Sequence, residues 1–137
     1  KDELEAKFSI PFCLAILILD RKAGIEQFTL ERVKSPDIVD MMPKIKAYLD
    51  ETIEEMGFER IRSVVEIKLK NGKTVRKEAS TSRGTPERPM SVDELNTKFR
   101  ECASGILASD NIEKSIKTIW NIENEKSLEH LISILTF

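Results

Sequence analysis

The sequence lacks an apolar run long enough to cross a membrane. Its longest such run, IPFCLAILIL at residues 10–19, is about half as long as the roughly 20 residues that a spanning helix needs. A secretion signal is not favoured either, because acidic residues precede the run, charged residues follow it, and no small-residue cleavage site is present. The run instead predicts a buried helix, with Ser9 as its N-cap and Pro11 in its first turn. We therefore expect a protein of the cytoplasm or an organelle matrix that is not secreted.

Histidine and cysteine are scarce. The chain has one histidine, His130, and two cysteines, Cys13 and Cys102, neither of which has a C-x-x-C neighbour. We therefore expect no metal site, two buried free thiols on apolar helix faces, and a structural role for His130. A glycine-rich phosphate loop is also absent, since Asn71-Gly72 is typical of a hairpin turn. From these motifs alone, the chain has no visible catalytic residue and no cofactor site.

The sequence has no excess of charge of one sign. It holds 22 basic and 24 acidic residues, with a net charge of −2, and aromatic residues make up only 6%. This balance argues against nucleic acid as a partner. Two local runs of like charge each leave two interpretations open. The acidic run is either a solvated loop or a cation site, and the basic run is either a solvated edge or an anion site. The solvated interpretation is favoured for both. The acidic run is Asp50, Glu51, Glu54 and Glu55, and the basic run is Arg76, Lys77, Arg83 and Arg88.

Residues 60–80, RIRSVVEIKLKNGKTVRKEAS, predict a β-hairpin that turns at Asn71-Gly72. A three-residue loop with Gly72 in the left-handed region places Val75 opposite Ile67, which suits a buried face better than the two-residue alternative. That face comprises Ile61, Val65, Ile67 and Leu69.

The remaining patterns predict mainly helices. Ser35 and Pro36 begin a short helix that ends at Pro43; residues 44–50 alternate as a strand, and residues 51–59 form an acidic loop. Three C-terminal helices begin at Ser91 (a capping box with Glu94), Asp110 and Ser127. Their apolar stripes are Val92, Leu95, Phe99, Cys102 and Ile106; Ile112, Ile116, Ile119 and Trp120; and Leu128, Leu131, Ile132 and Leu135. The predicted fold class is α+β: a small antiparallel sheet with an N-terminal helix and three C-terminal helices, whose excess apolar surface suggests a partner domain.

Five segments, taken in order, resemble the C-terminal domain of the MmgE/PrpD family, which includes 2-methylcitrate dehydratase, cis-aconitate decarboxylase and iminodisuccinate epimerase. They span essentially the whole chain with consistent spacing. The segments are EAKFSIPFCLAILILD, GIEQFTLERVKSPDI, VEIKLKNGKTVRKE, RGTPERPMSVDELNTKFREC and TIWNIENEKSLEHLISIL. The resemblance implies a two-domain enzyme without a cofactor, homodimeric at full length, in which a large helical domain, mostly upstream, supplies most catalytic residues.

On this resemblance, residues 1–90 form the α+β lid region, and residues 91–137 are helices that pack on the missing helical domain. The family's catalytic tyrosine falls outside the chain and does not match Tyr48, so no catalytic residue is carried over. The substrate-adjacent candidates are Lys7 and Ser9; helix capping is the favoured role of Ser9, and a solvated surface residue is the equal alternative for Lys7. The start at Lys1 rather than Met also suggests a fragment.

The expected function is that of a lid domain in a 2-methylcitrate dehydratase-like lyase. The full-length enzyme would act on a small tricarboxylate, and the isolated chain would be inactive. The alternative is a free-standing, non-catalytic interaction or ligand-binding module that keeps the lid fold.

Overall fold

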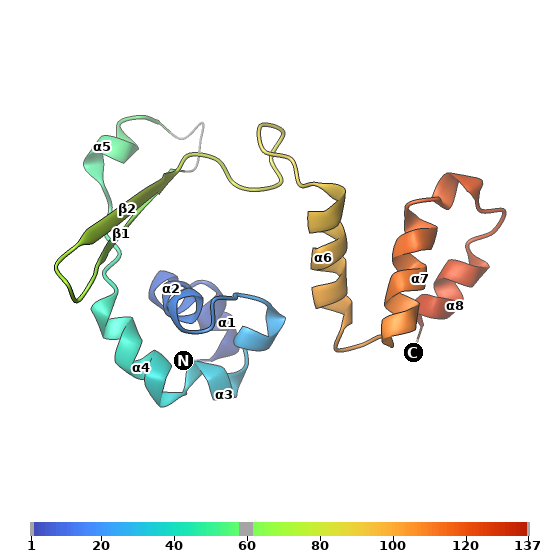
Figure 1. The fold of residues 1–137 in the computed structure, drawn as a ribbon, viewed down its shortest axis with the longest axis horizontal. Coiled ribbons are helices and arrows are strands. Elements are labelled where there is room, and N and C mark those ends of the chain that lie inside the picture. Colours follow the sequence, from blue (N-terminus) through green and yellow to red (C-terminus); the bar gives the residue numbers. More distant parts are fainter. Residues whose placement is uncertain (1, 58–61, 137) are drawn as a thin grey trace. The chain divides into compact units, whose positions relative to one another are not determined.

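The computed structural model describes residues 2–57 and 62–136, and the chain divides into two compact units. One unit joins Lys1–Ala47 to Asp93–Phe137, and the other is Tyr48–Val92. The first holds α1 (Glu3–Lys7), α2 (Ile10–Leu19), α3 (Leu30–Val33), α4 (Pro36–Met41), α7 (Ser109–Ile119), α8 (Glu129–Leu135) and nearly all of α6 (Val92–Ala103) (Figure 1). The second holds α5 (Glu51–Glu54), β1 (Ser63–Lys68) and β2 (Thr74–Ala79). The predicted α+β class is confirmed.

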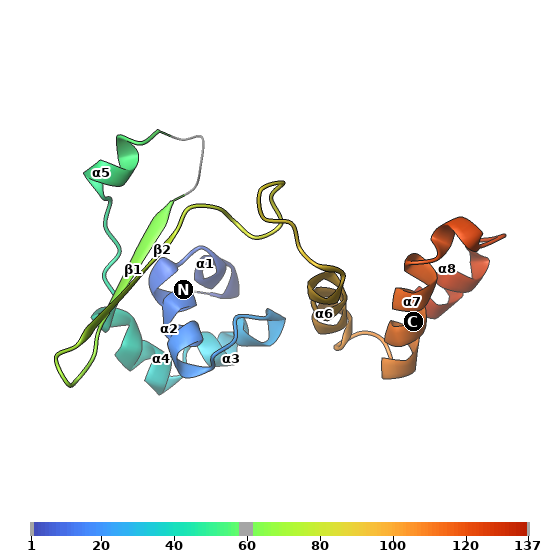
Figure 2. The same cartoon turned by 45° about the horizontal axis from the view of Figure 1, so that its top comes forward.

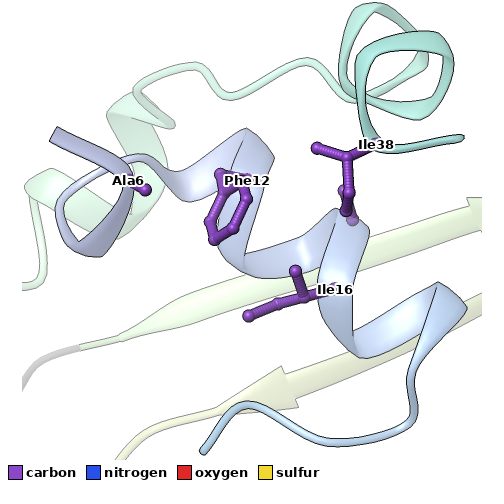
Figure 3. Close-up of a cluster of buried hydrophobic side chains, with 5 residues drawn as sticks. Ala6, Phe12, Ile16 and Ile38 are labelled. Atoms are coloured by element: carbon purple, nitrogen blue, oxygen red, sulfur yellow. The ribbon is translucent and has the colours of Figure 1, made fainter. Parts of the chain in front are cut away.

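Helix α2 carries the core of the first unit. Phe12, Ala15 and Ile16 are almost fully buried, and Ile38 of α4 and Ala6 of α1 complete the cluster (Figure 3). The Phe12 ring lies 5.6 Å from the ring of Phe28, in a tilted arrangement that aromatic pairs favour. Helices α1, α3 and α4 gather around α2, as Figure 2 shows. The apolar run is therefore a core helix, as predicted.

The start of α2 follows its sequence signals closely. The Ser9 hydroxyl oxygen accepts a hydrogen bond from the backbone N–H of Phe12 at 3.3 Å, and Pro11 lies in the first turn. The predicted cap is thus confirmed. A separate short helix, α1, precedes it and was not predicted, although Asp2 caps it by accepting a hydrogen bond from the Glu5 N–H at 2.9 Å.

The hairpin has the predicted register. Ile67 pairs with Val75, and Gly72 has a φ of +82°, a left-handed conformation that glycine adopts without strain. The Leu69 N–H donates to the Lys73 carbonyl at 2.8 Å, which leaves a three-residue loop. The bulged turn is therefore confirmed. Val65, Ile67, Leu69 and Val75 remain exposed on their common face, and Ile61 lies outside the described residues.

The strand predicted for residues 44–50 does not form. Met42–Lys44 is a 3₁₀ turn that contains Pro43, and no regular element follows it until α5 begins at Glu51. The Asp50 carboxylate caps α5 by accepting a hydrogen bond from the Thr52 N–H at 3.0 Å. A 3₁₀ turn before the segment and a helix cap at its end leave little room for strand pairing. The predicted acidic loop likewise contains α5, and its residues 58 and 59 lie outside the described part.

All three C-terminal helices are present. Helix α7 begins at Ser109, one residue before its predicted start, and α8 at Glu129, two residues after, where the Ser127 hydroxyl oxygen accepts from the Glu129 N–H at 3.2 Å. Helices α7 and α8 contact each other, and Ile112, Ile116 and Ile134 are buried. The prediction that both thiols are buried is wrong, because Cys102 is exposed and Cys13 only half-buried. Ile119 and Trp120, expected to face inward, are also exposed, and no residue of α6 is buried. Sequence periodicity identified these stripes, but nothing in the described residues covers them fully.

Across residues 2–57 and 62–136, no helix combines the length and the apolarity needed to span a bilayer.

Candidate functional site

The junction between α1 and α2 holds both residues that the sequence singled out, Lys7 and Ser9. Ser9 is half-buried, and its hydroxyl oxygen already serves the α2 cap. The Lys7 side chain is exposed at the end of α1, and within the described residues its ammonium group forms no ion pair. Its neighbours Phe8 and Ile10 are exposed apolar residues. The junction therefore offers one free cation beside apolar surface, which can hold a carboxylate.

The densest polar cluster of the first unit surrounds Arg32 of α3 and was missed at the sequence level. Arg32 Nε donates to Asp20 Oδ2 at 3.0 Å, and Nη1 donates to Asp37 Oδ1 at 2.8 Å and to Ser35 Oγ at 2.7 Å. The hydrogen bonds that Asp37 accepts from Arg32 lower the pKa of the Asp37 carboxyl group to about 2. The carboxylates of Asp20 and Asp37 in turn raise the pKa of Arg32. Because these partners engage Nε and both terminal nitrogens of the guanidinium, the cluster ties α2, α3 and α4 together and leaves little to bind a ligand.

The same cluster explains an exception in the α4 cap. Ser35 occupies the N-cap position, as predicted, but its hydroxyl makes no cap bond. It donates instead to the Arg32 carbonyl at 2.7 Å. The sequence did contain a signal for this cluster: Ser35 and Asp37 follow Arg32 by three and five positions, so their hydroxyl and carboxylate groups can both reach its guanidinium.

An open cleft of about 230 Å³ lies in the first unit and includes Lys22, Glu26, Arg100 and Glu101 in its lining. Lys22 Nζ lies 3.6 Å from a Glu101 carboxylate oxygen. Arg100 makes a two-point contact with Glu113, with Nε 2.6 Å from Oε1 and Nη2 2.9 Å from Oε2, which lowers the pKa of Glu113. Both cations are thus neutralised by carboxylates, so the cleft does not favour an anionic ligand.

The other sequence candidates do not assemble into a catalytic centre. His130 is exposed on α8, and burial raises the pKa of the half-buried Cys13 thiol, which disfavours the reactive thiolate. Asp50 belongs to the acidic run, but the Thr52 hydroxyl and the backbone of α5 hydrogen-bond its carboxylate and lower its pKa. In the part of the chain that the structure describes, no three metal-binding side chains come together.

Comparison with known proteins supplies what the geometry does not. Residues 1–124 match the family model described as the MmgE/PrpD C-terminal domain. The chain is 26% identical over 134 residues to cis-aconitate decarboxylase of Mus musculus and 25% identical over 134 residues to that of Homo sapiens. Each alignment covers 97% of this chain and 27% of the relative, so the chain spans about a quarter of the length of these curated relatives. The family model covers most of the chain, which therefore belongs to the MmgE/PrpD family as a C-terminal domain.

Proposed function

We propose that this chain is the lid domain of a lyase that acts on a tricarboxylic acid, and that it is inactive on its own. The observation that carries the proposal is the extent of the match: nearly the whole chain aligns with about a quarter of each cis-aconitate decarboxylase. A domain of this size is one part of such an enzyme. The remaining length supplies the groups that react.

The chemistry of the reaction supports a lid role for this chain, with the reacting groups supplied by the rest of the enzyme. Removing a proton from a tricarboxylate and expelling carbon dioxide or water requires a positioned base, a positioned acid and cations that hold the carboxylates. In the described residues, Lys7 is a free cation, whereas Arg32 and Arg100 are engaged by carboxylates. A closing lid contributes mainly by excluding water, which strengthens the electrostatic interactions of the site.

Lys7 is the residue of this chain that we assign to the substrate, with its ammonium group paired to a carboxylate. In the polypeptide that carries this domain, Lys7→Gln should raise KM about tenfold or more, because it removes a charged hydrogen bond. The matched control is Lys34→Gln, which changes an exposed lysine of the same unit. Equal kinetics for the two variants would remove Lys7 from the site. For Ser9 we propose that the α2 cap places the hydroxyl beside the substrate, so Ser9→Ala should alter KM more than Ser9→Thr, which keeps both the hydroxyl and the cap.

Two substrates fit the proposal. Dehydration of 2-methylcitrate is the reaction expected from the sequence, and the names of the two relatives favour decarboxylation of cis-aconitate. The deciding experiment assays the polypeptide that carries this domain, and this chain alone, on both acids. Carbon dioxide release reports decarboxylation, and ultraviolet absorbance of a new carbon–carbon double bond reports dehydration.

The outcomes separate the hypotheses. Activity of the longer polypeptide alone on either acid would support the lid assignment and name the reaction. Activity of this chain alone would contradict it. Inactivity of both on every tricarboxylate tested would favour the alternative, a non-catalytic binding module.

The proposal also assigns roles to the two parts of the chain and to its surroundings. Residues 1–90 form the lid region, and residues 91–137 pack on the helical domain, consistent with exposed apolar side chains such as Trp120 and Ile132. We propose that the full-length enzyme is a homodimer in the cytoplasm or an organelle matrix, where free thiols such as Cys13 and Cys102 persist. Mass measurement of the longer polypeptide in solution tests the dimer.

A further inference from the structure

Strand β1 has a free edge. In the part of the chain that the structure describes, only β2 pairs with it (Figure 1). The Leu69 N–H donates to the Lys73 carbonyl at 2.8 Å, and hydrogen-bonded pairs alternate with non-bonded pairs along an antiparallel ladder. Every second residue of β1 therefore directs its backbone groups toward β2, and the residues between them, Val64, Glu66 and Lys68, direct theirs away. An unpaired edge of this kind is a template for another strand.

The residues along this edge are self-complementary. Ile67 is preceded by Glu66 and Val65 and followed by Lys68 and Leu69. When two copies of β1 run antiparallel with Ile67 opposite Ile67, each Glu66 lies opposite Lys68 of the other copy. Each Val65 likewise lies opposite Leu69 of the other copy. Opposite charges and apolar side chains placed directly opposite each other stabilise a sheet, so this register has favourable pairs at all five positions.

The charges also exclude the neighbouring registers. Because only alternate residues direct their backbone groups to the free edge, two copies can slide past each other only in steps of two residues. One step in one direction places Glu66 opposite Glu66, and one step in the other places Lys68 opposite Lys68. Like charges directly opposite each other destabilise a strand pair. One register is therefore favoured over both of its neighbours.

The free edge of β2 is not self-complementary. The register that places Arg76 opposite Glu78 also places Lys77 opposite Lys77. A step of two residues in either direction places Arg76 opposite Arg76 or Glu78 opposite Glu78. Every one of these registers therefore contains a like-charge pair, and the β1 edge is the one suited to a second copy.

Pairing through β1 also joins two apolar surfaces. Val65, Ile67, Leu69 and Val75 lie on one face of the hairpin and are 37–46% exposed. Two paired hairpins place these four residues of each copy side by side in one larger patch. On the opposite face, Glu66 lies 3.6 Å from the Arg76 guanidinium of its own hairpin, and pairing adds a lysine of the second copy on its other side.

We propose that β1 pairs antiparallel with β1 of a second copy of this chain, with Ile67 opposite Ile67, and that the two hairpins form a four-stranded sheet. The inference does not depend on the proposed function. The strand is six residues long, so the contact is smaller than the roughly 1,200 Å² at which stable interfaces begin. The dimer is accordingly weak: it forms at a chain concentration of about 1 mM and dissociates at about 10 µM.

A single disulfide tests the register. The two copies of residue 67 form a non-hydrogen-bonded pair with Cα atoms about 4.5 Å apart, which a disulfide can bridge. Ile67→Cys, in a chain whose Cys13 and Cys102 are replaced by serine, should therefore oxidise to a covalent dimer. The matched control is Val75→Cys, which is similarly exposed but lies on β2. Its copies would be three strand spacings apart, about 14 Å, and should not crosslink.

Charge reversal tests the same contact without a crosslink. Lys68→Glu places two carboxylates opposite each other at both ends of the contact and should raise the Kd of the dimer about tenfold. Sedimentation over a range of concentrations measures it. Lys77→Glu makes the same charge change on β2 and should leave the Kd unchanged. Glu66→Lys with Arg76→Glu, which keeps an opposite-charge pair across the hairpin, should also weaken the dimer. Mixing this double variant with Lys68→Glu should restore pairing, because both contacts then join opposite charges.

Four results would overturn the inference. The first is a chain that stays monomeric at about 1 mM. The second is equal crosslinking of Ile67→Cys and Val75→Cys, which would show that collisions are unspecific. The third is a dimer that Lys68→Glu leaves unchanged, because another surface would then hold it. The fourth is slow hydrogen exchange of the Glu66 and Lys68 amides at every concentration, because another part of the same chain would then cover the edge.

Discussion

The guanidinium of Arg32 meets the carboxylate of Asp20 side-on, with Nε 3.0 Å from Oδ2 and a second contact through Nη2. The two residues lie 12 positions apart, on α3 and just after α2, and their side chains are each only 21% exposed. This contact, together with that to Asp37, fixes how three short helices meet beside the core.

Replacing Arg32 by lysine keeps the charge but removes the planar two-point contact with Asp20. We expect Arg32→Lys to lower the free energy of unfolding by about 1–2 kcal/mol, because hydrogen bonds between charged groups are lost in a largely covered setting. Chemical denaturation of this chain measures the change. Arg21→Lys is the control, since Arg21 is exposed and makes no ion pair within the described residues. Equal stability of the two variants would show that a point charge suffices at position 32.

Asp37 should make stability depend on pH in the acid range. Its pKa is about 2 in the folded chain, against an ordinary value of 3.8, because Arg32 hydrogen-bonds the ionised carboxylate. A lowered folded pKa stabilises the fold above the unfolded value, and this contribution disappears as pH falls from about 4 to about 2. The stability advantage of the wild type over Asp37→Asn should therefore be constant above pH 5, fall steeply between pH 4 and pH 2, and vanish only below pH 2. An advantage that does not change between pH 5 and pH 2 would assign it to something other than ionisation.

Local sequence patterns predicted local structure well, but contacts between residues far apart in the sequence were not predicted. The Ser9 cap and the Gly72 turn depend on residues within three positions, so their patterns sufficed. The strand expected before Asp50 failed because alternation alone does not supply a pairing partner. The Arg32 cluster was missed because it joins residues that share no periodicity. The burial of Cys102 was predicted wrongly for a related reason. An apolar stripe shows that a helix face is suited to burial, but whether another element covers that face depends on tertiary contacts that the stripe does not reveal.

The core around α2 can be tested with two neighbouring residues. Ile16 is fully buried, whereas Leu17 is 44% exposed on the same helix. We expect Ile16→Ala to cost about 2–5 kcal/mol, because it removes buried methyl groups and leaves a cavity. Leu17→Ala should cost much less, since alanine also favours helices. Thermal unfolding of both variants measures the difference, and equal losses would mean that Leu17 is covered in solution.

Gly72 in the hairpin turn and Gly105 after α6 distinguish the effect of backbone conformation from that of available space. An added Cβ meets no atom within 4 Å at Gly72 or at Gly105, but only Gly72 has a positive φ. Gly72→Ala should therefore destabilise the hairpin by about 1 kcal/mol, the cost of a left-handed backbone for alanine. Gly105→Ala should be neutral or slightly stabilising, because alanine reduces the freedom of the unfolded chain. Backbone chemical shifts of β1 and β2 would report the first effect, and unchanged shifts with unchanged stability would contradict it.

The apolar side chains of the C-terminal region should make this chain bind hydrophobic dyes or self-associate when it is expressed alone. Ile119, Ile122, Leu128 and Ile132 are 38–57% exposed around α7 and α8. Exposed apolar surface of this kind favours association with another apolar surface. Leu128→Glu with Ile132→Glu should reduce dye fluorescence and restore a monomer in sedimentation, with little loss of stability. Ile112→Glu is the contrasting variant, because it places a charge at a buried position of α7 and should unfold that region. A wild-type chain that stays monomeric and binds no dye would contradict both this expectation and the packing proposed for residues 91–137.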